Sequence, residues 1–230
     1  MKKLMQDKNN LVFSCSIETG IANAIRRSVN EIPILAIDEV DIYKNDSALY
    51  DQILAHRLGL IPLKNQKIAE GKSISVKLKK KGEDVLAGEF GKDIVYPEMP
   101  IVYLEKGQEL EIVARARQGT GKEHAKFVPG LVYYKYLNKI KIDKEGEKWT
   151  ELAELYPEIF EFEDKLKVVD EWKGDLEPED VENFKGVKIE QTKEMVFFIE
   201  SWGMIEAKDI FLDAIKALKG NLEKVGKAIK

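Results

Sequence analysis

Apolar and polar residues alternate near the start of the chain in the way that is typical of a half-buried strand. Ser14 and Ser16 point to one face, and the apolar side chains share the other face: Leu11, Phe13, Cys15 and Ile17. Residues 7–10 before this run are typical of a turn. We expect Cys15 to be a small inward-facing hydrophobic residue and not a reactive thiol, because no neighbour would favour its thiolate.

A helical pattern follows over residues 19–30. Its predicted apolar stripe consists of Ile21, Ala24, Ile25 and Ser28. Arg26 and Arg27 lie in the last turns, where positive charge complements the helix dipole, so the pattern alone favours a structural role for this pair. Pro33 then ends the helix, and residues 34–43 predict a strand with one acidic face, whose alternation shifts once near residues 38–39.

A second helix is predicted between Asp46 or Ser47, as its N-cap, and Gly59, where it ends. Its predicted buried side chains are Leu49, Ile53, Leu54 and Leu58. His56 and Arg57 lie in the last turn, which is an ordinary place for cations. We expect His56 to be hydrogen-bonded and not metal-bound, because no second ligand lies at a usual spacing.

The pattern changes twice after the second helix. Residues 73–142 show short alternating runs separated by Gly and Pro, which predicts a β-rich module with many turns. Residues 149–191 are acidic and weakly periodic, which indicates a small appendage that packs on a larger part. Residues 195–199 predict a strongly apolar strand.

The last predicted helix carries a long apolar stripe. Its members repeat at alternating steps of four and three: Phe211, Ile215, Leu218, Leu222, Val225 and Ile229. Burial of each such side chain stabilises a protein by roughly 1.5–3 kcal/mol, and an exposed stripe of this length exceeds the apolar patch that a monomer normally tolerates. Gly220 and Gly226 each weaken the isolated helix by about 1 kcal/mol relative to Ala. Packing must therefore hold the last turns, either on the protein's own sheet or against a helix of another chain.

Composition narrows the possible functions. The 37 basic and 41 acidic residues give a net charge of −4, which disfavours a protein whose main role is to coat nucleic acid. Cys15 is the only cysteine, which excludes an intramolecular disulfide and a four-cysteine metal site. Only His56 and His124 are available, which argues against a His-rich metal centre. No apolar run is long enough to span a membrane and no signal-peptide pattern is present, so we expect a cytoplasmic protein.

One glycine-rich motif resembles a phosphate-binding loop but lacks its defining residues. Residues 119–124 would need Gly at position 116 and Ser or Thr at 123, where the chain has Ala116 and Glu123. A dinucleotide fingerprint would need Gly in place of His124. Three serines also lack the context of a catalytic nucleophile: Ser14, Ser28 and Ser201. Spacing alone therefore identifies no active site.

Two longer segments carry a specific resemblance. Residues 22–38 and 55–63 closely resemble the alpha-like family of RNA polymerase subunits, which includes the archaeal D subunit, the eukaryotic third-largest subunit and the bacterial alpha N-terminal domain. Residues 121–129 resemble the second signature of this family, and residues 198–203 resemble its closing strand. The resemblance covers nearly the whole chain.

The resemblance implies an α+β protein with three parts. A discontinuous dimerisation domain, a sheet plus helices from both chain ends, would comprise residues 1–44 and 193–230. A β-rich inserted domain would comprise residues 45–148, and a small degenerate ferredoxin-like appendage residues 149–192. In this family the first domain joins a smaller subunit, L in archaea, and the heterodimer recruits the large catalytic subunits. The implied function is therefore a non-catalytic assembly scaffold of a nucleotidyltransferase complex, which meets other small subunits there and DNA only indirectly.

The resemblance also implies two docking surfaces. The residues expected to bind the small subunit are Ile21, Ile25, Phe198, Trp202, Phe211, Ile215, Leu218, Leu222 and Val225. Those expected to dock the large subunits are Asn23, Arg26, Arg27, His56 and Arg57. Guanidinium groups suit planar recognition of partner carboxylates, so the resemblance moves the arginine pair from a structural to a docking role.

The appendage departs from the family pattern. Many archaeal D subunits hold iron–sulfur clusters in a ferredoxin-like domain, and residues 155–160 resemble a remnant of that domain. Tyr156 stands where a cysteine would precede Pro157, and no cysteine lies anywhere in the appendage. We therefore expect no cluster, and no other metal or cofactor.

One other class of function remains open. Residues 77–81 contain four lysines and would suit a stand-alone dimeric nucleic-acid-binding or regulatory protein, although such a run is usually a solvated face. A small-molecule enzyme rests only on the incomplete glycine loop and is the weakest alternative.

Overall fold

The computed structural model describes residues 1–69 and 71–229, and the chain divides into two compact units. The first unit comprises residues 1–5, 12–22 and 133–198, and the second comprises residues 6–11, 23–132 and 199–230. The chain mixes helices with a majority of strands, which confirms the expected α+β class. Within the described residues, no helix is both long and apolar enough to cross a membrane.

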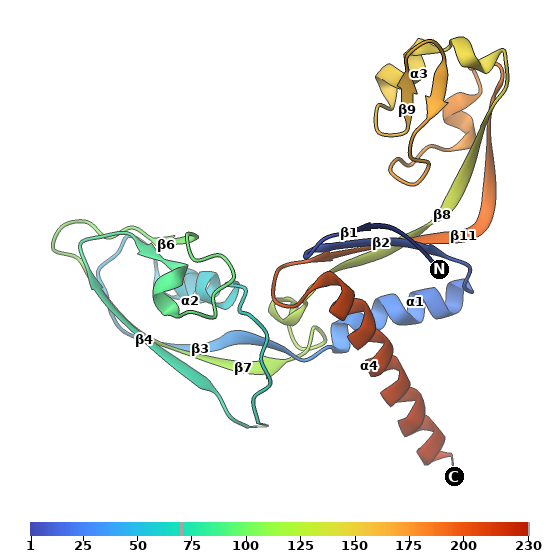
Figure 1. Cartoon of the computed structure of the whole chain (residues 1–230). Helices are drawn as coiled ribbons and strands as arrows, with labels where there is room; N and C mark the ends of the chain where they lie inside the picture. Colours follow the sequence, from blue (N-terminus) through green and yellow to red (C-terminus); the bar gives the residue numbers. More distant parts are fainter. Residues whose placement is uncertain (70, 230) are drawn as a thin grey trace. The chain divides into compact units, whose positions relative to one another are not determined.

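A four-stranded sheet contributes most of its residues to the first unit (Figure 1). Its strands, in spatial order, are β1 (Lys2–Gln6), β2 (Asn10–Cys15), β11 (Val187–Ser201) and β8 (Gly130–Ile142). The sheet therefore places strands from the two ends of the chain side by side. Phe13 of β2 stacks on Phe197 of β11 with ring centroids 5.3 Å apart. Both rings are buried, so an apolar core joins the terminal strands.

Apart from Met1 and residues 16–22, the rest of the first unit is the appendage. It contains α3 (Thr150–Leu155) and the antiparallel pair β9 (Phe160–Phe162) and β10 (Leu166–Val168), with short 3₁₀ turns η4 (Gly146–Lys148) and η5 (Pro178–Val181). Its apolar core consists of Leu152, Ile159, Phe160, Leu166, Leu176, Val181 and Val187. The weak periodicity of this segment arises because short elements of different kinds share that core.

The second unit is built on an antiparallel sheet in the order β3 (Ile34–Asn45), β7 (Glu109–Gly119) and β4 (Ile74–Lys81). The helix α2 (Asp51–Gly59) packs on β3, and a second pair joins β5 (Val85–Leu86) to β6 (Pro100–Val102). The register of β3 shifts between Ile37 and Glu39, where the alternation of the sequence predicts a shift. Two short 3₁₀ turns, η2 (Ala87–Phe90) and η3 (Ala125–Phe127), complete this part.

Two predictions about α2 are wrong. Asp46 and Ser47 precede the helix, which begins after Tyr50 without a side-chain cap. The carboxylate of Asp46 instead accepts a hydrogen bond from the backbone N–H of Glu109, and the Ser47 hydroxyl donates to Asn45. Ile53 is exposed, because only the face that carries Leu54 and Leu58 meets the core.

The first helix is shorter than predicted, and its buried face differs from the predicted apolar stripe. α1 spans Thr19–Ser28, and the next three residues form the 3₁₀ turn η1 (Val29–Glu31). Ala22, Ile25 and Ser28 are buried, whereas Ile21 is 48% exposed and Ala24 is half-buried. The buried face is therefore rotated from the predicted stripe towards Ala22, and Ile21 lies outside it. The final helix, α4, spans Ala207–Ala228 in the second unit.

Candidate assembly surfaces

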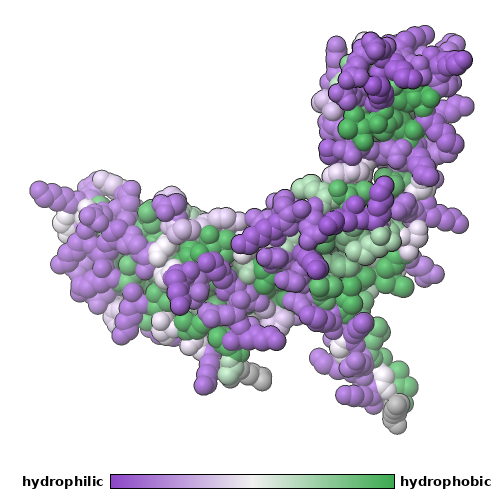
Figure 2. Space-filling view, viewed as in Figure 1, coloured by the Kyte–Doolittle hydropathy of each residue, from purple (hydrophilic) through white to green (hydrophobic). Residues whose placement is uncertain are grey.

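The outer end of α4 presents an uncovered apolar face (Figures 1 and 2). Ala207, Ile210 and Ala214 are buried against the rest of the chain. The predicted stripe lies beside that inner face: Phe211, Ile215 and Leu218 are half-buried, and exposure rises to 63% at Leu222, 55% at Val225 and 80% at Ile229. The second half of the stripe therefore does not lie on the protein's own sheet.

Other residues assigned to the small-subunit surface behave differently. Ile21 and Trp202 are exposed. Phe198 is half-buried and stacks on Tyr133, with ring centroids 4.7 Å apart. Ile25 is only 6% exposed, so its side chain belongs to the chain's own core and is not available to a partner. The burial of Ile25 agrees with its place in the predicted apolar stripe of α1, whereas its place on the partner surface came only from the resemblance.

The arginine pair on α1 faces solvent. The Nε and Nη2 atoms of Arg26 donate to Oδ1 of Asn23 at 3.2 and 2.9 Å, which orients this guanidinium along the helix. Arg26 and Arg27 are both exposed, and neither forms an ion pair within the described residues. Unpaired guanidinium groups at a surface retain their capacity to bind carboxylates of a partner.

His56 and Arg57 occupy the last turn of α2, as the sequence predicts, and both are exposed. Nη2 of Arg57 donates to the backbone carbonyl of Pro100 at 2.7 Å, so one edge of this guanidinium is already occupied. This pair and the arginines of α1 lie on different helices. No hydrogen bond or ion pair among the described residues connects the two sets.

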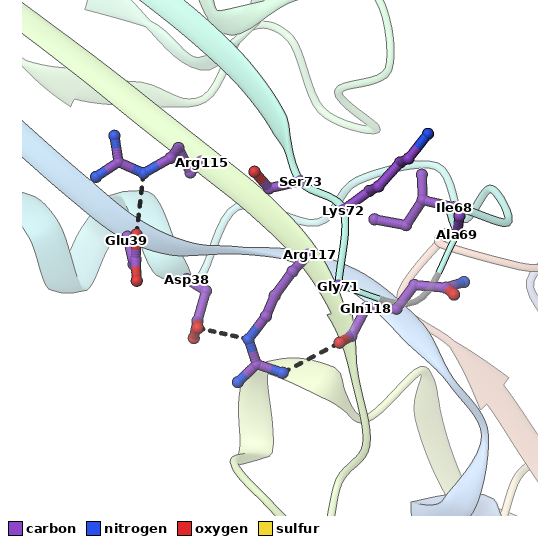
Figure 3. A pocket seen from close by; sticks show the side chains of 10 residues that line it. All are labelled: Asp38, Glu39, Ile68, Ala69, Gly71, Lys72, Ser73, Arg115, Arg117 and Gln118. Carbon is purple, nitrogen blue, oxygen red and sulfur yellow. Dashed lines mark hydrogen bonds and ion pairs between the residues drawn. The ribbon is translucent and has the colours of Figure 1, made fainter.

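A polar cavity of about 440 Å³ lies beside β3 and β7 (Figure 3). Nε of Arg115 donates to Glu39 at 2.9 Å and Nη1 donates to Asp41 at 2.6 Å, while Nε of Arg117 donates to Asp38 at 2.6 Å. Lys126 also donates to Asp38 and, with Arg117, holds the pKa of that carboxyl below its usual range. The carboxylates therefore neutralise the arginines, which argues against an anion site. Sequence reasoning missed this network because the partners are more than 70 residues apart.

The glycine-rich loop is explained by packing. A Cβ atom on Gly119 would lie 2.6 Å from the buried ring of Phe127, and one on Gly121 would lie 3.1 Å from Cα of Asn30. The Nδ1 atom of His124 accepts a hydrogen bond from the backbone N–H of Lys126 and so caps η3. These contacts account for the motif without a bound phosphate.

The lysine-rich strand β4 is largely neutralised. Glu109 lies within ion-pair distance of Lys44, Lys79 and Lys81, at 3.0, 3.4 and 3.2 Å. Hydrogen bonds from these lysines, led by Lys44, lower the pKa of Glu109 to about 2. Lys80 pairs with Glu89 at 2.7 Å. This pairing weakens the case for a nucleic-acid-binding surface.

The donor set of the appendage does not fit an iron–sulfur cluster. Thiolates are the usual ligands of such clusters, and the only cysteine, Cys15, lies on β2 and not in the appendage. Burial raises the pKa of its thiol, which disfavours the thiolate. Tyr156 packs against the apolar core of the appendage.

Comparison with known proteins first defines a class. Residues 37–130 match the family described as the RNA polymerase Rpb3/RpoA insert domain, a range that runs from β3 to the first residue of β8. The predicted inserted domain, residues 45–148, would place all of β8 inside it, yet β8 pairs with β11 in the other sheet. Periodicity predicts strands but does not identify their partners. The chain is therefore of the class of polymerase subunits that carry this insert.

Full-length relatives then define the family. The DNA-directed RNA polymerase subunit Rpo3 of Pyrococcus horikoshii is 33% identical over 95% of this chain and 93% of its own length. Rpo3 of Methanocaldococcus jannaschii is 31% identical over 92% of this chain and 86% of its own length. The subunit rpac1 of RNA polymerases I and III of Dictyostelium discoideum is 31% identical over 93% of this chain and 76% of its own length. The chain belongs to the Rpo3 family of DNA-directed RNA polymerase subunits, which confirms the resemblance drawn from residues 22–38 and 55–63.

Proposed function

We propose that this chain is a non-catalytic assembly subunit of DNA-dependent RNA polymerase. In this role it pairs with a smaller subunit, L in archaea, to form an alpha-like heterodimer, and the heterodimer recruits the large catalytic subunits. The chain supplies no catalytic residues itself and meets DNA only through the complex. The observation that carries this proposal is the uncovered apolar face of α4, because a chain complete by itself would bury those side chains.

The free face of α4 supports a helical partner. Leu222, Val225 and Ile229 are mostly exposed in the single chain, and residues three and four apart share one helix face. Burial of each against a partner would contribute about 1.5–3 kcal/mol. The residues proposed to bind the small subunit are Ile21 and Phe198 in the first unit and Trp202, Phe211, Ile215, Leu218, Leu222 and Val225 in the second, extended here by Ile229.

A second surface is proposed for the large subunits. It comprises Asn23, Arg26 and Arg27 on α1 and His56 and Arg57 on α2. The exposed guanidinium groups of α1 support this assignment, because they have no carboxylate partner within the described part of the chain. Acidic or carbonyl-rich segments of the large subunits would complement them.

We also propose that the appendage works without a cluster. Its packed apolar core and its lack of cysteine support a domain that folds without a bound cluster. Anaerobically purified protein should therefore lack a visible absorbance band and stoichiometric iron and sulfide. Iron and sulfide in a fixed ratio to the chain would contradict this part of the proposal.

Co-expression tests the function directly. This chain and the smaller polymerase subunit of the same organism should elute together as a 1:1 complex, whose mass light scattering can measure. Addition of the large subunits should then give a larger assembly. Separate elution of the two chains at micromolar concentration would contradict the proposal.

A further inference from the structure

Glu31, the last residue of η1, receives hydrogen bonds from two segments that are distant in sequence. Nδ2 of Asn221 on α4 donates to Oε2 of Glu31 at 2.5 Å. Nζ of Lys122, in the glycine-rich loop, lies 2.9 Å from Oε1. Each carboxylate oxygen thus holds one segment, and η1 joins α4 to the loop.

The loop reaches η1 because of Gly121. A Cβ atom at this position would lie 3.1 Å from Cα of Asn30 and 2.8 Å from the side chain of Val128. Only glycine permits so close an approach without displacement of a neighbour. The close contact places the next residue, Lys122, beside Glu31.

On α4, Asn221 marks the point where the helix leaves the rest of the chain. Ala207, Ile210 and Ala214 are buried before it, and every described residue from Leu222 onward is exposed. The bond to Glu31 is the last side-chain hydrogen bond from α4 to another element within the described residues. The hydrogen bonds from Asn221 and Lys122 both lower the pKa of Glu31, so its carboxylate stays charged at neutral pH.

We propose that Glu31 is a positioning residue that orients the outer half of α4 for its partner. Through Asn221 it fixes the direction of the turns that carry Leu222, Val225 and Ile229. Through Lys122, the same carboxylate is also bound to the glycine-rich loop, so the loop helps to fix the position of Glu31. The inference rests on the proposed function, since it concerns the same docking face, and it assigns the glycine-rich motif a role in assembly.

Three variants in the full chain test the proposal: Asn221→Ala, Glu31→Gln and Lys122→Ala. Affinity for the smaller polymerase subunit and amide hydrogen exchange of residues 214–228 are measured for each. Asn221→Ala should weaken pairing roughly tenfold, the factor expected for loss of one hydrogen bond to a charged group. Glu31→Gln retains an acceptor but not the charge, so its effect should be smaller. Lys122→Ala should have the smallest effect, because the side chain of Lys122 is mostly exposed.

Lys227→Ala is the matched control. Lys227 is exposed on the same helix, away from both the apolar face and Glu31, so neither affinity nor exchange should change. The positioning role predicts that exchange and affinity change together in Asn221→Ala, while the thermal midpoint of the chain stays near that of the wild type.

The outcomes separate the two proposals. If the wild-type chain does not pair with the smaller subunit, the proposed function fails. If the wild type pairs and Asn221→Ala pairs equally well, the positioning role is wrong, whether or not its exchange rises. Weaker pairing with faster exchange in Asn221→Ala, and unchanged behaviour of Lys227→Ala, would support it.

Discussion

The β3–β7–β4 sheet and the helix α4 differ in how many of their side chains are buried or ion-paired within the chain. The apolar face of the sheet shares a buried core with α2. On the charged face, acidic residues form ion pairs with Arg115, Arg117 and the lysines of β4. α4 buries one narrow face and leaves the apolar residues of its last turns exposed. The comparison teaches that the sheet pairs and buries most of its side chains within the chain, whereas α4 leaves apolar side chains exposed, as the proposed docking role requires.

The largest expected effect is loss of pairing when α4 is made polar. Leu222→Asp combined with Val225→Asp should leave the single chain folded, because both side chains are exposed. In a complex the new carboxylates would be buried without partners, at a cost of several kcal/mol, so pairing should weaken by roughly a thousandfold or more. Calorimetric titration with the smaller subunit measures this.

Lys227→Asp is the control for that variant. It changes the net charge by the same two units on the same helix but lies off the apolar face, so pairing should persist. Equal loss of pairing in both variants would show that charge, and not the apolar face, decides the contact.

The next effect concerns the arginine pair. Arg26→Ala with Arg27→Ala should leave the heterodimer intact but reduce recruitment of the large subunits, because arginine anchors at interfaces often contribute about 2 kcal/mol or more each. Recovery of assembled polymerase from a reconstitution mixture gives the readout. The account of this surface is wrong if variant and wild type are recovered equally.

Within the sheet, a methyl group at the glycine-rich loop should disturb packing. Gly119→Ala places Cβ 2.6 Å from the ring of Phe127 and should destabilise the chain by about 1–3 kcal/mol. Gly20→Ala is the control, since among the described residues no atom beyond its chain neighbours and its own helix backbone lies within 4 Å of its Cβ, and Ala favours the helix. Denaturant unfolding compares the two, and a neutral Gly119→Ala would contradict the packing role.

The charged side of the sheet should respond to acid. The pKa of Glu109 falls from 4.5 in an unpaired state to about 2 in the folded chain, so its stabilising effect is complete above pH 4.5. That effect is lost as the pH falls from 4.5 towards 2. The thermal midpoint of the wild type should therefore fall more steeply across this range than that of Glu109→Gln. Glu98→Gln, which removes an exposed carboxylate, should follow the wild type.

The smallest effect separates the two faces of α4. Gly220→Ala and Gly226→Ala should each stabilise the helix by up to about 1 kcal/mol, and neither added methyl group lies within 4 Å of another element in the described part of the chain. Gly226 lies on the free face, four residues after Leu222 and three before Ile229, so only Gly226→Ala should reduce pairing. Equal affinities would place the partner elsewhere.

Most elements could be predicted from periodicity, including the register shift in β3 and the length of the apolar stripe on α4. β1 could not, because only Leu4 is even half-buried and no alternation results. Ile53 on α2 and Ile21 on α1, which the pattern places on buried faces but which are exposed, show the limit for single residues. Apolar character predicts a side chain's preference for burial, but the neighbouring elements decide which face receives it.

The residues of the proposed docking surfaces follow only in part from the sequence pattern. The stripe on α4 follows from its spacing, whereas the large-subunit surface depended on resemblance. The hydrogen bond between Asn221 and Glu31 joins residues that are 190 positions apart in the sequence. The ion pairs that Arg115 and Arg117 form with acidic residues of β3 depend on how β3 aligns with β7. Contacts of this kind arise from tertiary structure and leave no periodic signal in the sequence.

The central claim is that α4 is left open for a second chain. Native mass spectrometry of the complex that carries this chain, purified from its own host, tests it most directly. The account predicts the mass of a 1:1 heterodimer with a smaller subunit, alone or within the polymerase. The mass of a folded solitary chain would contradict it.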